Sequence, residues 1–119
     1  MRYKEIEKNK EINAYLTKGN ANLGQLGFTD HSQAHCVQVA HQAGKILKRF
    51  GYSEHEIELA KIAGYMHDIG NAINRTHHAE YGALLANELL KDTDMTLEDR
   101  ITVVSAIGNH DESTGSPVD

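Results

Sequence analysis

The sequence predicts a single all-helical domain, a bundle of about five helices, and three observations favour this fold class. Proline occurs only once, at Pro117, so almost nothing in the chain interrupts helices. Apolar residues recur at spacings of three and four along most of the chain, as they do on one face of an α-helix. No stretch alternates apolar and polar residues over four or more positions, as a half-buried strand would. A length of 119 residues suits one domain, covering 1–119, with a modest core.

The N-terminal segment 1–20 carries the first predicted helix, from about Tyr3 to Lys18. It stops at Gly19, because glycine favours the position just after a helix. The following segment, GNANLGQLGFTD, holds three glycines and two asparagines, so it is expected to form a loop. The apolar side of this helix is thin, which leaves open whether the helix packs on the domain or on a partner chain.

Four further helices follow, each with signals at its ends. They run from about Ser32 to Phe50, Glu54 to Met66, His77 to Lys91 and Leu97 to Asn109. Ser53 and Glu56 form a capping box for the second of these, and Thr76 and Thr96 can cap the next two. The β-branched stretch ITVVSAI looks like a strand, but the cap before it and its helical spacing favour a helix. The tail, 112–119, is expected to be irregular.

Composition and charge narrow the compartment and the partners. The net charge is −5 with histidine neutral, and a domain of that charge binds nucleic-acid backbone poorly, so no nucleic acid partner is expected. A small anionic substrate remains compatible, because a metal ion can supply positive charge locally. Cys36 is the single cysteine, the charged N-terminus lacks the apolar core of a signal peptide, and no apolar run approaches a membrane span. We therefore expect a cytoplasmic protein that does not bind membranes.

Eight histidines are the unusual feature of this composition. The apolar positions Ile57, Ala60 and Gly64 lead by helical spacing to His67, which is followed by Asp68. A buried histidine and a buried carboxylate are both costly without partners, and one metal cation would satisfy both.

Three other helices also place a histidine at the edge of the predicted inward face. Each lies on the apolar line of its helix: His35 with Val39 and Ile46, His78 with Gly82, and His110 with Ile107. Facing helices of a bundle are a common setting for metal sites. Any one of these histidines is explained about as well by hydrogen bonding in a core. The four together with an aspartate favour a metal over the alternative of a purely structural bundle.

The histidines occur in four segments in a characteristic order. These are HCVQVA with His35, MHDIG with His67 and Asp68, HAEYGA with His78, and IGNHDE with His110. The set resembles the HD superfamily of metal-dependent phosphohydrolases, over about residues 29–112. HDIG at the end of an apolar helix, preceded about thirty residues earlier by the His35 segment HCVQVA, is a specific match. The resemblance implies an all-helical HD domain in which the first His, the HD pair and a later Asp hold one metal.

Carried over to this chain, the resemblance implies a defined ligand set. His35, His67 and Asp68 match the ligands of a first metal, and His78 and His110 match those of a second, with Asp68 as the bridge. Imidazole and carboxylate ligands suit Mn, Fe, Co, Ni or Zn, and one or two such ions are expected per chain. A metal of this kind activates water for attack on phosphorus and polarises the phosphoryl oxygen.

Other residues are candidates for chemistry around the metal. Asp68 is expected to be catalytic as the bridge, and Glu112 is a candidate general base, although an exposed helix-end glutamate is the simpler interpretation. Candidates for substrate contact are His31, Lys45, Arg75 and Asp111. The expected substrate is a phosphomonoester or phosphodiester of a nucleotide-like small molecule. No motif identifies it more closely, and the GYP segment of one phosphodiesterase branch is absent.

Three departures from the family pattern bear on function. The family's last Asp, on a helix after the final His, has no counterpart here; Asn71 stands where many relatives have Lys; and His110-Asp111 stands where two-metal phosphodiesterases often have paired His. The first departure indicates either a C-terminally truncated domain or a site completed by another chain, and we expect a homodimer. It also keeps open a second hypothesis, a catalytically inactive HD module that binds metal or nucleotide for regulation.

Overall fold

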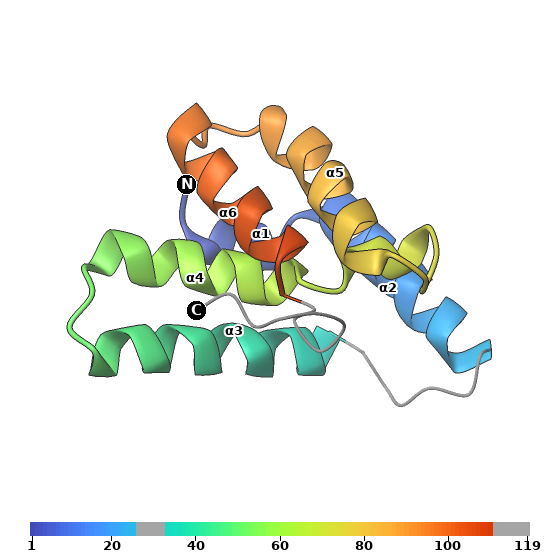
Figure 1. Ribbon diagram of the computed structural model, residues 1–119, viewed down its shortest axis with the longest axis horizontal. Helices are drawn as coiled ribbons and strands as arrows, with labels where there is room; N and C mark the ends of the chain where they lie inside the picture. Colours follow the sequence, from blue (N-terminus) through green and yellow to red (C-terminus); the bar gives the residue numbers. More distant parts are fainter. Residues whose placement is uncertain (26–32, 111–119) are drawn as a thin grey trace.

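The computed structural model describes residues 1–25 and 33–110, and the described residues contain helices and no strand (Figure 1). The helices are α1 (Tyr3–Glu7), α2 (Lys10–Gln25), α3 (Gln33–Arg49), α4 (Glu54–Met66), the 3-10 helix η1 (Ile69–Ala72), α5 (His78–Lys91) and α6 (Leu97–Gly108). The all-helical prediction is therefore confirmed. The last four predicted helices correspond to α3, α4, α5 and α6, with ends within one residue of those predicted.

The prediction for the N-terminal helix is wrong in two respects. The helix is broken after Glu7 into α1 and α2, and α2 then continues through Gly19 to Gln25. The break arises because the side-chain oxygen of Asn9 accepts a hydrogen bond of 2.9 Å from a backbone N–H in the first turn of α2. Gly19 is not a stop but a contact point, since a Cβ added there would lie 3.2 Å from the backbone nitrogen of Ala72. This glycine therefore lets α2 pack closely on η1.

Helix α4 lies at the centre of the arrangement (Figure 1). It packs antiparallel to α3, and α1 and α6 also contact it. Helix α5 packs along α6, while η1 lies between α2 and α5. The antiparallel pairing brings the N-terminal end of α3 beside the C-terminal end of α4, where the HDIG segment begins.

The buried side chains bear on two details of the predicted faces. Tyr3 and Ile6 are almost fully buried, so α1 packs on the rest of the domain, one of the two alternatives that the sequence left open. Ile46, which the sequence analysis placed on the inward line of His35, is 54% exposed, because the buried line of α3 runs instead through Cys36 and Ala40. Among the described residues, no helix combines the length and the apolar character that crossing a bilayer requires.

Two of the three predicted caps are present. Ser53 and Glu56 form the reciprocal capping box before α4, and the Thr96 side chain accepts a hydrogen bond of 3.2 Å at the start of α6. Thr76 does not cap α5, because the residue before the helix is His77 and no side-chain cap hydrogen bond is made there. The chain enters α5 instead through His77, whose φ of 60° lies in the left-handed region that few residues other than glycine adopt.

The glycine of the HDIG segment fixes the packing of η1 on α5. A Cβ added to Gly70 would overlap the backbone carbonyl of His78 and would lie 2.6 Å from the backbone nitrogen of Gly82. These atoms belong to the first turns of a helix, so they cannot move aside as a flexible side chain would. Only glycine at this position lets the turn after α4 reach α5.

We expect Gly70→Ala to destabilise the fold by about 2–3 kcal/mol, as overpacking against backbone does. Gly24→Ala is the matched control, because a Cβ on Gly24 meets no atom within 4 Å and alanine is the better helix former. Urea unfolding followed by far-UV circular dichroism measures both variants. Equal midpoints for Gly70→Ala and the wild type would contradict the packing role.

Candidate metal centre

Helix ends from four parts of the chain meet at one place (Figure 1). His35 lies in the first turn of α3, His67 directly follows α4, and Asp68 precedes η1. His78 is the first residue of α5, and His110 follows the last turn of α6. The structure thus brings together all five residues that the sequence predicts as metal ligands.

The carboxylate of Asp68 lies in the middle of the histidines. Its Oδ2 is 3.0 Å from Nε2 of His67, while its Oδ1 is 3.5 Å from Nε2 of His78 and 3.6 Å from Nε2 of His110. The side chains of Asp68 and His78 are buried, and those of His67 and His110 are partly buried. One carboxylate oxygen therefore faces one histidine, and the other oxygen faces two.

Two groups of ligand atoms share this carboxylate. His35, His67 and Asp68 form one group, and Asp68, His78 and His110 form the other, with the ligand atoms of each group within 4.8 Å of one another. The rings of His35 and His67 lie 5.7 Å apart between centroids, and those of His78 and His110 lie 5.1 Å apart. This is the arrangement expected of two adjacent cation sites bridged by one aspartate.

Backbone carbonyls orient histidine rings of this cluster. His67, His78 and His110 each place Nδ1 against the carbonyl oxygen three residues earlier, at 2.7, 3.2 and 2.6 Å. A carbonyl oxygen only accepts, so each Nδ1 carries a proton and donates. In the neutral ring the proton is then absent from Nε2, whose lone pair faces the Asp68 carboxylate. The same device orients imidazole ligands in many metal sites.

The donor set fits a divalent transition metal. Nε2 of His78 and Nε2 of His110 lie 3.2 Å apart, and neither can donate to the other when both are neutral. Burial lowers the pKa of His78, and the nearby Arg75 guanidinium lowers it further, which favours the neutral ring. Two lone pairs and a carboxylate oxygen then face one another, and a cation with nitrogen and oxygen ligands resolves that conflict.

Asn71 supports the centre in a way that the sequence analysis missed. It is 1% exposed, and its Nδ2 donates to the backbone carbonyl of Asp68 at 3.0 Å. Its own carbonyl accepts from the side chain of Asn22 on α2 at 2.9 Å. Asn71 therefore positions the turn that carries Asp68, at the position where many relatives of the resembled family have Lys. No periodic pattern marks such side chain to backbone contacts.

The remaining predicted residues are distributed differently. Arg75 lies beside the centre, since its carbonyl accepts from His78 and its charge acts on that ring. Lys45 is exposed and follows His35 by ten residues of α3, a rise of about 15 Å, so the structure does not bring it to the histidines. His31, Asp111 and Glu112 lie outside the described residues.

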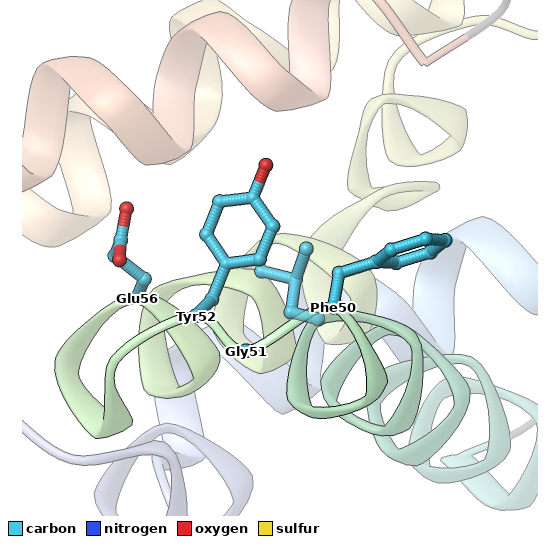
Figure 2. Close-up of a pocket in the computed structure, with 5 residues that line it drawn as sticks. Phe50, Gly51, Tyr52 and Glu56 are labelled. Carbon is cyan, nitrogen blue, oxygen red and sulfur yellow. The ribbon is translucent and has the colours of Figure 1, made fainter.

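An open hollow of about 610 Å³ lies at the other end of α3 and α4 (Figure 2). It surrounds the turn between these helices, where Phe50, Tyr52 and Glu56 line it. Because α3 and α4 are antiparallel, this turn lies a helix length away from His35 and His67. The hollow contributes no residue to the histidine cluster.

Comparison with known proteins places this arrangement in a family. The family model of the HD domain matches residues 33–117. An uncharacterized protein of Methanocaldococcus jannaschii, MJ1020, is 32% identical over 107 residues, covering 77% of this chain and 41% of that protein. Ribonuclease Y of Lawsonia intracellularis is 34% identical over 99 residues, covering 80% of this chain and 18% of the enzyme.

Ribonuclease Y of Enterococcus faecalis is similar in the same way, with 34% identity over 95 residues, 74% of this chain and 16% of that enzyme. This chain thus spans less than half the length of each of these relatives. No solved structure shows a significant match. The family model matches most of the chain, and the matched region contains Asp68 and the histidines around it. The chain therefore belongs to the HD domain family.

Proposed function

We propose that this chain is a metal-dependent phosphohydrolase that cleaves a phosphomonoester or phosphodiester of a nucleotide-like small molecule. The observation that carries the proposal is the Asp68 carboxylate shared between two groups of histidine ligands. Membership of the HD domain family, whose members are generally metal-dependent hydrolases, supports the same reaction class.

The clustered residues would have distinct roles in such a reaction. His35, His67 and Asp68 would hold one metal, and Asp68, His78 and His110 a second. When bound, divalent metals of the Mn, Fe, Co, Ni or Zn type supply an activated water and polarise the phosphoryl oxygen. The hydrogen bonds from Nδ1 keep the rings in place throughout, so little reorganisation accompanies the reaction.

The substrate class follows from charge. A net charge of −5 disfavours a long polyanion, whereas the Arg75 guanidinium beside His78 offers one local contact for a phosphate. A small phosphorylated molecule meets both conditions. A second candidate, an RNA phosphodiester, is favoured by the Ribonuclease Y relatives alone, and they are matched over at most 18% of their length.

Metal content tests the ligand set. We expect about two equivalents of transition metal per wild-type chain, about one in His110→Ala and almost none in Asp68→Ala, because Asp68 serves both sites. Elemental mass spectrometry after loading with Mn, Fe and Zn measures this, and circular dichroism checks that each variant keeps its helices. A wild-type chain that takes up no metal would contradict the proposal and leave a structural role for the histidines.

Turnover tests the reaction. Metal-loaded wild type should hydrolyse bis(p-nitrophenyl) phosphate. Asp68→Ala should lower kcat/KM by more than about a hundredfold. Loss of a residue that only orients a metal ligand costs up to about a hundredfold, and Asp68 is itself a proposed ligand. His55→Ala is the control, since His55 is exposed and pairs with Asp99 away from the cluster. Metal uptake without turnover of this ester, of nucleotides or of single-stranded RNA would favour the regulatory module.

The choice between the two substrate classes comes from a direct comparison. A dinucleotide or nucleoside monophosphate should be cleaved with a higher kcat/KM than a long single-stranded RNA. The difference should grow as salt is lowered, because fewer ions then screen the repulsion between the negatively charged chain and the long RNA. Preference for the long RNA at physiological salt would replace the small-molecule proposal with the RNA one.

A further inference from the structure

A cavity of about 340 Å³ opens between the last turn of α2, η1 and the segment that leads to α5. This volume lies at the small end of the range of ligand pockets, roughly 300–1,000 Å³. Four of the residues that line it carry a carboxamide, namely Asn22, Gln25, Asn71 and Asn74. None of the described residues that line it is acidic, although acidic residues outnumber basic ones in the chain as a whole.

The cavity adjoins the metal centre through two residues of its wall. Asn71 donates to the backbone carbonyl of Asp68 at 3.0 Å, and the carbonyl of Arg75 accepts from the ring of His78 at 3.2 Å. Arg75 also lies close enough to His78 for its charge to act on that ring. A ligand with its anionic end at Arg75 would therefore have its other end in this cavity.

The polar groups of the wall are only partly used within the protein. Nδ2 of Asn22 donates to the carbonyl of Asn71, and Oδ1 of Asn74 accepts from the N–H of Thr76. Oδ1 of Asn71 is buried and has no hydrogen-bond partner in the part of the chain that the structure describes. Buried acceptors without a partner are rare, because the loss of water is not compensated. A ligand in the cavity cannot reach this buried atom, whereas Gln25 and Asn74 are exposed and offer carboxamides that a ligand can pair with.

An apolar surface completes the wall. Ile73 lines the cavity and is 53% exposed, next to the buried Leu23. A flat apolar molecule can pack on Ile73 while its edge meets the carboxamides. Asparagine and glutamine pair with the edge of a heterocyclic base through one donor and one acceptor, and arginine binds phosphate.

We propose that this cavity binds the base of a nucleotide substrate, with the phosphate held at Arg75 toward the histidines. The inference rests on the proposed function, and it assigns named residues to the recognition of the base in the nucleotide-like substrate. Ile73 and the carboxamides of Gln25 and Asn74 then determine specificity, and they take no part in the reaction itself.

The test compares two probes that differ only in the base. Isothermal titration of the Mn-loaded chain measures the binding of the phosphonate analogue of adenosine monophosphate and of the matching base-free ribose phosphonate. The nucleotide analogue should bind at least about tenfold more tightly. Ile73→Ala and Gln25→Ala should reduce this ratio toward one without changing the affinity for the base-free probe. Leu84→Ala, an exposed residue that does not line the cavity, should leave the ratio unchanged.

Two results would overturn the inference. These are equal affinities for the two probes in the wild type, or a preference that both Ile73→Ala and Gln25→Ala leave intact. Turnover of bis(p-nitrophenyl) phosphate in the same preparation separates this inference from the proposed function. Turnover with equal affinities removes only the base site, whereas preferential nucleotide binding without turnover keeps the base site and removes the hydrolase.

Discussion

The centre of this fold depends on one carboxylate. Asp68 is buried at the junction of helix ends and faces the Nε2 atoms of His67, His78 and His110 at 3.0–3.6 Å. A negative charge in such a place is stable only with charged or hydrogen-bonded partners around it. The close contacts of Gly70 with α5 and of Gly19 with η1 hold the turn that carries it. The ends of the helices thus meet around a polar group, while buried side chains of all the helices form the apolar core.

Local signals in the sequence were sufficient for most of the fold. Helices α3 to α6 were predicted because their apolar spacing and the caps Ser53 and Thr96 act within a few residues of chain. The continuation of α2 through Gly19 was not predicted, because a glycine in the sequence is equally consistent with the end of a helix and with close packing between helices. Only the position of η1 beside α2 distinguishes the two, and that is set by residues about fifty positions away.

The candidate site was predicted to a similar extent and for a similar reason. Helical spacing led to His67, His78 and His110, since a residue at a helix end continues the stripe that the helix presents to its neighbours. Lys45 was misplaced because charge type alone does not show how far along a helix a residue lies from the site. Asn22 and Asn71 were missed because they bond to backbone atoms of distant segments, and such bonds have no period.

The bonds from the histidine rings to backbone carbonyls tie the ligands to the most fragile parts of their helices. Terminal turns ordinarily fray first, at little cost in free energy. Here the last turns of α4 and α6 each hold a ring through a carbonyl, at 2.7 and 2.6 Å. If either turn opens, its ring loses both orientation and tautomer at once. The ligand set therefore stays assembled only as long as both of these helix ends stay closed. The rate of amide hydrogen exchange in the last turns of α4 and α6 would report how often they open.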